Sequence, residues 1–377
     1  MTPGSRPRVA IVHDYLTQRG GAERVVLALA AAFPGAPVHT SFYAPEETFP
    51  EFATLDVRTM PINRVRVLRD HHRLAFPVLA PAFSRLRVAA DVVICSSTGW
   101  AHGAHVTGRC VVYCHSPARW LWVKDQYLPP GSSIGKRAAL AAVERPLRSW
   151  DIRAARRADR YLVNSSLILD RVKRAYDIDA EIVPPPFTLA VGGERRSPAP
   201  SLAPGFFLCV SRLLPYKNVG QVVQAFAALP DQRLVVVGSG PDESAVRDFA
   251  GANVAFTGTV GDEELAWLYG NAVGLIAASY EDFGITPLEA AAFGIPVAAL
   301  RWGGFLDTIR DGETGVFFDQ PEPAPIRDAV VRMLDRHWDR AALEAHAAMF
   351  SEDRFVQRLR TVVDEELGAS PRGPSLI

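Results

Sequence analysis

The sequence has no apolar run of the roughly 20 residues that a membrane-spanning helix needs. Its first residues, Met-Thr-Pro-Gly-Ser-Arg-Pro, lack the apolar core of a secretory signal peptide, so a cytoplasmic protein is expected. Cysteine is also scarce, since only four are present, and all lie in or beside apolar stretches. Cys110 and Cys114 have no second pair of ligands at metal-site spacing. Buried reduced thiols are therefore expected, and neither disulfides nor a metal site.

Net charge is missing too, because 41 Lys and Arg residues balance 41 Asp and Glu residues. The balance hides an asymmetry: residues 1–190 carry 25 basic and 16 acidic side chains, and residues 191–377 carry 16 and 25. A basic first half favours an anionic surface or substrate as its partner. Within it, segment 58–87 gathers arginines around an apolar stretch broken by Pro77 and Pro81. This pattern indicates either contact with an anionic membrane surface or a helix pair with a solvated basic face.

A chain of 377 residues exceeds what one core usually organises. Short apolar stretches alternate with segments of helical spacing, and the alternation restarts after a stretch rich in Gly, Ser and Pro. This predicts an α/β fold of two Rossmann-like parallel-sheet domains facing a central cleft. The expected parts are a first domain over 1–190, a linker over 191–204, a second domain over 205–350, a helix over 351–367 that could pack back on the first domain, and a tail over 368–377.

The stretch 281–296 organises the second half, because it joins a predicted strand to a helix with a clear start signal. Thr286 is the expected N-cap, and Glu289 follows it by three residues, as in a capping box. Gly284 lies in the preceding loop, where a missing side chain lets a ligand approach the backbone. Loop and helix start together predict an anion site, interpreted as a diphosphate site framed by Glu281 and Glu289.

Lysine is rare in this chain, since it supplies only four of the 41 basic residues. Lys217 is the only lysine after residue 173, and it stands with Arg212 just beyond the predicted strand 206–210. A compact ammonium group at the carboxyl end of a strand suits a phosphate. The alternative is an ordinary lysine in a surface loop.

Several motifs stand at or shortly after the ends of predicted strands. They are Arg212-x4-Lys217, Gly238-Ser239-Gly240-Pro241, Gly258-Thr259-Val260, Glu281-x7-Glu289, His13-Asp14-Tyr15, Gly20-Gly21-Ala22-Glu23 and the run from Tyr113 to Trp122. Together they resemble the retaining nucleotide-sugar glycosyltransferases of family four, which have the GT-B architecture. The last three resemble its bacterial O-antigen and exopolysaccharide mannosyltransferases. The resemblance covers nearly the whole chain.

The resemblance implies a role for each motif. Arg212 and Lys217 would neutralise the donor diphosphate, Glu289 would bind ribose hydroxyls, and Glu281 would hold the transferred sugar. The structural alternatives are helix capping for Glu289, a solvated loop carboxylate for Glu281, a tight turn for Gly20 and Gly21, and a core histidine for His115. The implied residues are Arg212, Lys217, Glu281 and His115 for catalysis; Gly20, Gly21, Gly258, Thr259, Val260, Phe283, Gly284, Ile285, Thr286 and Glu289 for the donor; and Asp14, Arg119 and Trp122 for the acceptor.

The implied reaction is a retaining, metal-independent transfer of mannose from GDP-mannose to a lipid-linked or glycan acceptor in cell-surface polysaccharide synthesis. The nucleotide-sugar is a substrate, so no cofactor is implied, and no nucleic-acid partner is expected. Asp307 stands where such enzymes often carry a Glu after Gly303-Gly304, which leaves the sugar open. Alternatives are a UDP-sugar transferase with a soluble acceptor, a nucleotide-sugar epimerase, or a non-catalytic nucleotide-sugar-binding subunit. The implied location is the cytoplasm, peripheral to the inner face of the membrane if segment 58–87 contacts lipid.

Overall fold

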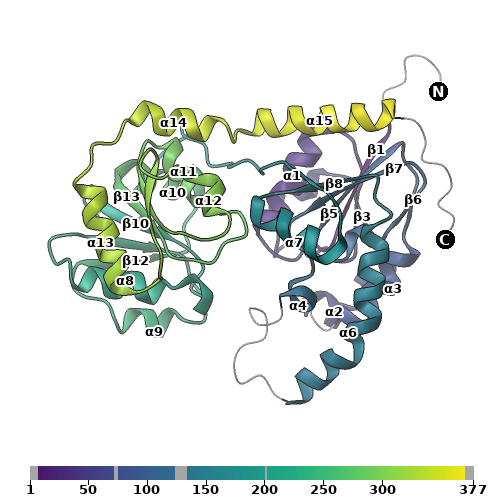
Figure 1. The fold of residues 1–377 in the computed structure, drawn as a ribbon, viewed down its shortest axis with the longest axis horizontal. Helices are drawn as coiled ribbons and strands as arrows, with labels where there is room; N and C mark the ends of the chain where they lie inside the picture. The colour runs from purple at the N-terminus through teal and green to yellow at the C-terminus, as the bar shows by residue number, and fades with distance from the viewer. Residues whose placement is uncertain (1–6, 72–74, 124–133, 200–201, 370–377) are drawn as a thin grey trace. The chain divides into compact units, whose positions relative to one another are not determined.

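The structure is a computed structural model that describes residues 7–71, 75–123, 134–199 and 202–369. Most of the predicted tail and residues 72–74 of the basic segment lie outside these ranges. The chain divides into two compact units, Met1–Pro185 with Asp353–Ile377, and Pro186–Glu352 (Figure 1). The last helix therefore belongs to the first unit, although it follows the second in the chain.

The first unit is built on a parallel sheet in the order β3-β2-β1-β5-β7-β8-β9. Its strands are β1 (Val9–His13), β2 (Val38–Thr40), β3 (Val57–Thr59), β5 (Val92–Ser97), β7 (Arg109–Cys114), β8 (Arg160–Val163) and β9 (Glu181–Ile182), and β4 (Arg87–Val88) pairs separately with β6 (His105–Val106). Its helices are α1 (Gly21–Ala32), α2 (Arg66–Asp70), α3 (Phe76–Arg85), α4 (Arg119–Trp122), α6 (Ile134–Ala155), α7 (Ser166–Tyr176) and α15 (Glu352–Gly368).

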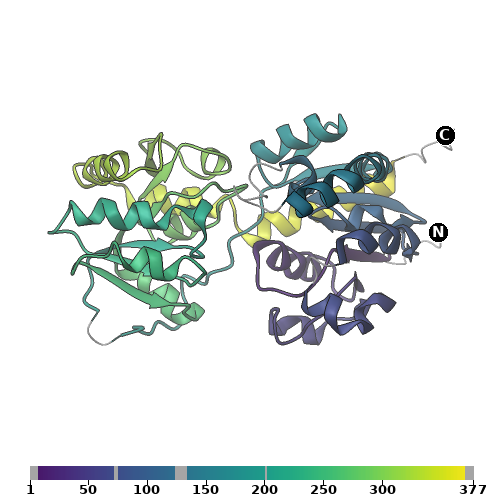
Figure 2. The same ribbon diagram turned by 90° about the horizontal axis from the view of Figure 1, so that it is seen from below.

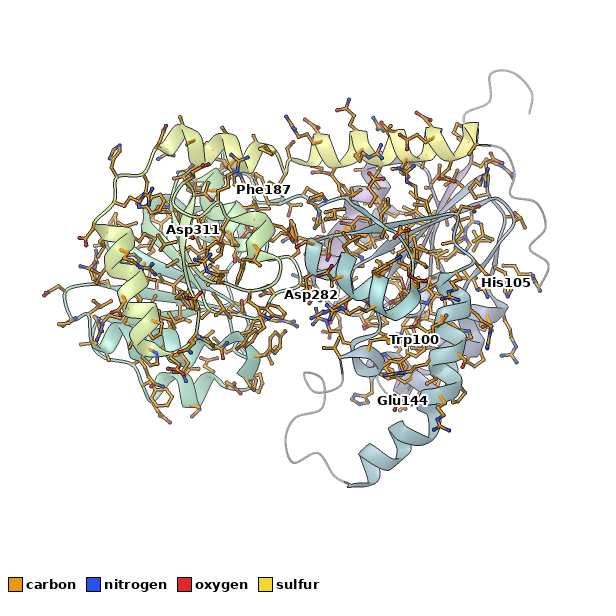
Figure 3. All side chains as sticks on the ribbon, in the orientation of Figure 1. Trp100, His105, Glu144, Phe187, Asp282 and Asp311 are labelled. Carbon is orange, nitrogen blue, oxygen red and sulfur yellow. The ribbon has the colours of Figure 1, made fainter. Side chains whose placement is uncertain are left out.

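Both faces of this sheet are buried, as the continuous apolar strands require. Along β1, Val12 points into a core shared with α3, α6 and α7, whereas Ile11 points into a core shared with α1 and α15. Trp100, which is labelled in Figure 3, belongs to the first of these cores. It stacks on Trp120, with ring centroids 5.2 Å apart. This two-sided burial is the arrangement of a doubly wound Rossmann-like domain.

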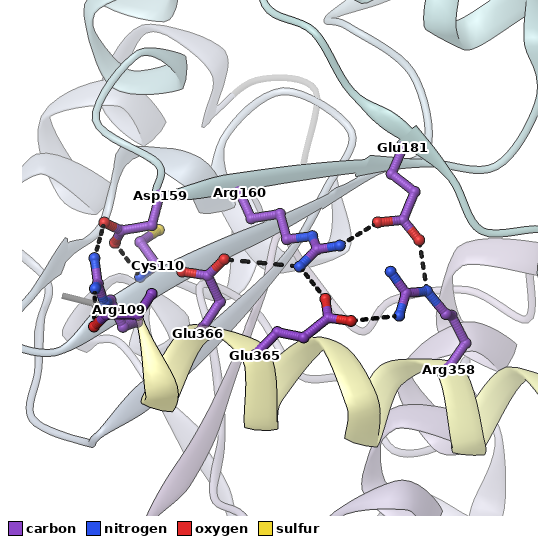
Figure 4. Close-up of polar contacts among 9 residues, drawn as sticks. Arg109, Cys110, Asp159, Arg160, Glu181, Arg358, Glu365 and Glu366 are labelled. Atoms are coloured by element: carbon purple, nitrogen blue, oxygen red, sulfur yellow. Dashed lines mark hydrogen bonds and ion pairs between the residues drawn. The ribbon is translucent and has the colours of Figure 1, made fainter.

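The helix α15 is fixed to the first unit by apolar contacts and by charges. Phe355 is buried against Tyr113 of β7, with ring centroids 5.7 Å apart. On the outer side, Arg358 and Arg160 share the carboxylates of Glu181 and Glu365 (Figure 4). Burial alone would raise the pKa of Glu181, but the hydrogen bonds from Arg358 and Arg160 outweigh it and lower that pKa.

The second unit repeats the design with a parallel sheet in the order β12-β11-β10-β13-β14-β15. Helices cover both faces of each sheet (Figure 2). Its strands are β10 (Phe206–Val210), β11 (Leu234–Val237), β12 (Val254–Gly258), β13 (Ala272–Ala277), β14 (Val297–Leu300) and β15 (Gly315–Phe318). Its helices are α8 (Val219–Ala227), α9 (Glu243–Arg247), α10 (Asp262–Asn271), α11 (Thr286–Ala292), α12 (Phe305–Thr308), α13 (Pro323–Leu334) and α14 (Arg340–Ala348). The prediction of an α/β fold with two Rossmann-like domains is confirmed.

The apolar stretch of the basic segment is not broken by its second proline, because α3 continues through Pro81. Leu79 and Phe83 of this helix are fully buried in the core of the first unit. They are therefore unable to enter a bilayer in the folded protein. The exposed large apolar side chains of the segment are Val78 on α3, and Val65 and Val67 around the start of α2.

Phe355→Ala should destabilise the protein by about 3–5 kcal/mol, because it leaves a cavity between α15 and Tyr113. Urea unfolding followed by tryptophan fluorescence would measure the loss. Phe249→Ala is the matched control, since Phe249 is 48% exposed and its removal leaves no buried cavity. Equal stability losses for the two variants would contradict the packing of α15.

Candidate active site

The carboxyl ends of β10, β13 and β14 lie side by side in the second sheet, and their loops carry the charged residues singled out above. The loop after β10 carries Arg212 and Lys217, and the loop after β13 carries Glu281. Asn218 ties these loops together, because its amide nitrogen donates to the carbonyl oxygen of Ala278 at 2.9 Å. The fold thus brings together residues that are far apart in the sequence.

Lys217 and Glu281 form an ion pair at the centre of this cluster. Lys217 is only 8% exposed, and its ammonium group donates to Oε1 of Glu281. The Ser279 hydroxyl donates to the same oxygen at 3.0 Å. The Lys217 nitrogen also lies 5.0 Å from the centroid of the Tyr216 ring. A buried cation held by one carboxylate is a prepared site for a second anion, because the cost of desolvating the lysine has already been met in folding.

Arg212 lies in the same loop as Lys217 and is exposed. Its guanidinium group lies 3.4 Å from the Tyr216 hydroxyl, a weak hydrogen bond that leaves donors free to rotate toward a ligand. Tyr216 and Tyr280 are exposed aromatic residues beside the pair, at 36% and 38%. Sequence reasoning missed both tyrosines, although each is next in sequence to a predicted charged residue.

The start of α11 differs from the prediction. Ile285 is the N-cap, Thr286 is the first helical residue, and no side chain caps the helix end. The predicted Thr286 cap is therefore wrong. Glu289 falls at the fourth helical position, so the capping box is wrong as well. The preceding loop has Gly284 in the left-handed conformation (φ +82°) and Ile285 already at helical angles (φ −78°, ψ −33°), so the helix begins one residue earlier than predicted.

Glu289 has a specific partner on another helix. Its Oε2 accepts a hydrogen bond of 2.8 Å from the hydroxyl of Tyr269 in α10. Tyr269 is fully buried, and burial first, then the Glu289 carboxylate, raises its pKa well above the ordinary value. The tyrosine therefore stays protonated and holds the half-buried Glu289 carboxylate in one orientation. Sequence reasoning did not identify Tyr269.

Gly258 is the last residue of β12, an edge strand of the same sheet, and Thr259 and Val260 follow it. Gly258 has a positive φ of 69°, and the exposed Thr259 hydroxyl lies 3.0 Å from the Ser239 hydroxyl. The loops after β11 and β12 are thus joined. Phe283 is 6% exposed, and its ring centroid lies 6.3 Å from that of Phe350.

The first sheet carries a second polar cluster at its carboxyl edge. His13 ends β1, Ser96 lies near the end of β5, and His115 follows β7, so the three come from adjacent strands. Ser96 Oγ lies 3.0 Å from His13 Nδ1 and 2.8 Å from His115 Nε2. Burial, and then the nearby His13, lowers the pKa of His115 to about 3. His115 is therefore neutral at physiological pH.

Asp14 and Trp122 have structural partners in this unit. The Asp14 carboxylate is buried and accepts hydrogen bonds from the backbone nitrogens of Thr98 and Trp100, at 2.7 and 3.2 Å, which fixes the loop after β5. Trp122 Nε1 donates to Asp151 at 2.6 Å, and Arg148 lies over the indole ring. Arg119 is exposed on α4.

Gly20 and Gly21 lie at the start of α1, but only one has a close neighbour. A Cβ on Gly20 would lie 2.6 Å from Oε2 of Glu23, whereas a Cβ on Gly21 would meet open space. Glu23 is buried, and desolvation raises its pKa although the nearby His13 lowers it. The Gly20 position thus accommodates a carboxylate, whereas Gly21 borders open space. Within the described ranges, no cluster of three or more His, Cys, Asp or Glu side chains could hold a metal ion.

The two units also match two family models. Residues 19–190 match the model described as Glycosyltransferase Family 4, and residues 194–348 match Glycosyl transferases group 1. The two Rossmann-like domains have the GT-B fold, and each matches a different glycosyltransferase family model. The first domain is thus similar to glycosyltransferase family 4, and the second to glycosyl transferases group 1.

Similar proteins include several glycosyltransferases. The D-inositol 3-phosphate glycosyltransferase of Salinispora arenicola (strain CNS-205) is 31% identical over 278 residues, 62% of each chain. Sulfoquinovosyl transferase SQD2 of Arabidopsis thaliana is 31% identical over 159 residues, 40% of this chain and 31% of the relative. The chain thus spans less than two thirds of the length of these curated relatives.

Two solved structures share the fold. Sucrose-phosphate synthase from Thermosynechococcus elongatus has a TM-score of 0.67 and 20% identity, covering 97% of this chain and 100% of that one. Anabaena Alr3699/HepE in complex with UDP and glucose has a TM-score of 0.68 and 16% identity, covering 95% and 100%. At these identities the likeness establishes the fold alone.

Gly284→Ala should cost about 1–3 kcal/mol, because alanine disfavours φ of +82° and its Cβ would lie 2.5 Å from the Phe305 ring. Thermal unfolding would measure the loss. Gly192→Ala is the control, since Gly192 is exposed, its φ is not in the left-handed region and an added Cβ would meet open space, and it should change stability by less than about 0.5 kcal/mol. A Gly284→Ala protein as stable as the control would show that the loop does not need this conformation.

Proposed function

We propose that this protein transfers a sugar from a nucleoside diphosphate sugar, with the donor bound by the loops after β10 and β13. The buried Lys217 beside Glu281 is the observation that carries this proposal. A nearly buried lysine with a single carboxylate partner is uncommon in a soluble domain. A diphosphate offers that ammonium group the strongest alternative partner.

The chemistry assigned to the second domain is stabilisation of a leaving group. As the bond between sugar and diphosphate breaks, negative charge grows on the diphosphate oxygens. Lys217 and, by rotation, Arg212 would neutralise that charge. The backbone N–H groups of residues 283–286 would add hydrogen bonds, although α11 has only seven residues and its dipole is correspondingly small.

The two carboxylates would bind different hydroxyl groups. Glu289, oriented by Tyr269, would accept hydrogen bonds from the ribose. Glu281 would exchange its bond with Lys217 for a bond to a hydroxyl of the transferred sugar once the diphosphate takes up the lysine. The backbone around Thr259 would face the base, and Gly21 would leave space for the donor beside the first domain. His115 would hold a hydroxyl of the transferred sugar.

We propose retention of anomeric configuration, with the acceptor hydroxyl giving its proton to the departing phosphate oxygen. GDP-mannose remains the proposed donor and mannose the transferred sugar, because the first-domain motifs resemble those of bacterial mannosyltransferases. UDP-sugars belong in the same test, because Anabaena Alr3699/HepE binds UDP and glucose. Asp14, Arg119 and Trp122 stay proposals for the acceptor side, with Asp14 and Trp122 restricted by the structural bonds described above.

The proposed acceptor is a lipid-linked sugar, and the proposed docking element is the start of α2. Val65 and Val67 are 48% and 61% exposed there, and Arg64, Arg66 and Arg69 surround them. An exposed apolar pair ringed by arginines suits an anionic membrane surface. No helix in the described ranges is long and apolar enough to cross a membrane.

Lys217→Met should lower turnover by about 100-fold or more, because it removes a charge that stabilises the leaving group. A thermal-shift panel with GDP-, UDP- and ADP-sugars would first identify the donor, since only a ligand that binds the native state raises Tm. The variant should lose that rise in Tm. Lys173→Met is the matched control, because Lys173 is half exposed and pairs with Asp177 and Asp179. Normal turnover in Lys217→Met would exclude the phosphate role.

Replacing Arg64, Arg66 and Arg69 together by Gln should weaken flotation with anionic vesicles at least about ten-fold, since each arginine near such a surface contributes about 1 kcal/mol. The same replacement of Arg247, Arg327 and Arg340, exposed arginines of the second unit, is the control. Equal binding of the wild type to neutral and anionic vesicles would exclude electrostatic docking.

A further inference from the structure

His115 is proposed above to hold a sugar hydroxyl, but a neutral histidine can do so in two ways. It either donates a hydrogen bond from a protonated ring nitrogen or accepts one at an unprotonated nitrogen. Which nitrogen carries the proton follows from the partners of the other. The hydrogen-bond chain through Ser96 supplies those partners, and it begins at His13.

His13 Nδ1 has two neighbours on Ser96. It lies 3.1 Å from the backbone carbonyl oxygen and 3.0 Å from the hydroxyl oxygen. A carbonyl oxygen only accepts hydrogen bonds, so Nδ1 of His13 must carry a proton. That proton is shared between the two oxygens of Ser96. The hydroxyl oxygen is therefore an acceptor toward His13.

The Ser96 hydroxyl has one proton to give, and its other neighbour is Nε2 of His115 at 2.8 Å. Among the described residues the hydroxyl proton of Ser96 has no other acceptor, so Ser96 donates to Nε2, which is then unprotonated. The low pKa of His115, lowered to about 3 by burial and then by His13, leaves the ring with a single proton. That proton is on Nδ1.

The surroundings keep the His115 ring in place. Its backbone nitrogen donates to the carbonyl oxygen of Ser97 at 2.9 Å, and its carbonyl oxygen accepts from the Asn164 amide at 3.2 Å. The Tyr113 ring packs against it at a centroid distance of 5.2 Å. Ser96 is fully buried and His115 is 9% exposed, so water does not compete effectively for Nε2.

We propose that His13 and Ser96 are positioning residues that hold His115 in the Nδ1–H tautomer, so that His115 offers the donor sugar a hydrogen-bond donor and no base. This rests on the proposed contact between His115 and the transferred sugar. The hydrogen bonds then all run in one direction: His13 donates to Ser96, Ser96 donates to His115, and His115 donates to a sugar oxygen. With Nε2 occupied by Ser96, His115 takes no proton from the acceptor hydroxyl.

The tautomer can be measured in the intact chain without any substrate. In protein labelled with 15N-histidine, long-range proton–nitrogen spectra distinguish protonated from unprotonated ring nitrogens, and His115→Gln assigns the His115 signals by their loss. We expect a protonated Nδ1 and an unprotonated Nε2. A protonated Nε2 in the wild type would overturn the proposal. Because this measurement is made on the wild-type protein, it does not depend on whether a variant folds.

Ser96→Ala tests the relay. Loss of the hydroxyl should shift His115 toward the Nε2–H tautomer and lower kcat about five- to ten-fold, as expected for one neutral hydrogen bond. Ser97→Ala is the matched control, because Ser97 is a buried serine of the same strand that bonds His102 Nδ1 at 2.9 Å. It should change the His102 signals and leave those of His115 unchanged.

An unchanged His115 tautomer in Ser96→Ala would overturn the role of Ser96. Failure of the proposed function gives a different result. The wild type could transfer no sugar from any nucleotide donor while His115 showed the expected tautomer and the expected change in Ser96→Ala. That result would support the hydrogen-bond series from His13 to His115 and exclude the proposed sugar transfer.

Discussion

Parallel strand pairing is the constraint on which the functional geometry depends. In a parallel sheet every strand ends at the same edge, so the loops that follow neighbouring strands meet there. In the second domain this brings Lys217, after β10, onto Glu281, after β13. In the first domain it aligns His13, Ser96 and His115 on three adjacent strands. The order of the strands in each sheet therefore explains why the members of each cluster lie close together.

The two clusters differ in what they are prepared to bind. The second domain holds a charged pair whose cation can exchange one anion for another, which suits a diphosphate. The first domain holds hydrogen-bond donors and acceptors of fixed direction around a neutral His115, which suits the hydroxyl groups of a sugar. Burial disfavours a charged side chain in both clusters. At Lys217 the ion pair with Glu281 compensates for this cost, whereas at His115 burial lowers the pKa and keeps the ring neutral.

The last helix links the stability of the first domain to its polar cluster. Phe355 of α15 packs on Tyr113, and Tyr113 packs on His115 two residues further along the chain. The Tyr113 hydroxyl also donates to the carbonyl oxygen of Val183 at 2.8 Å. A helix that follows the second domain in sequence therefore supports a strand end in the first. The arginine and glutamate network in Figure 4 fastens the same helix on its outer side.

Local patterns predicted much of this arrangement. The alternation of apolar strands and helices indicated two Rossmann-like domains, and the rarity of lysine singled out Lys217. The start of α11 was predicted wrongly at Thr286, because N-cap preference is a weak local signal that the Gly284 loop and the Phe305 ring override. Ser96 and Tyr269 could not be identified, since an ordinary serine and tyrosine gain their roles only from partners on other strands and helices.

The sequence by itself determined the periodicities, the charged loop residues and the family motifs, because these depend on neighbours along the chain. Only the tertiary structure decided which side chains share hydrogen bonds. Strand register places Ser96 between two histidines, and helix packing places Tyr269 on Glu289. The direction of a hydrogen bond is a property of such partners, so the protonated nitrogen of His115 follows from the fold and from no motif.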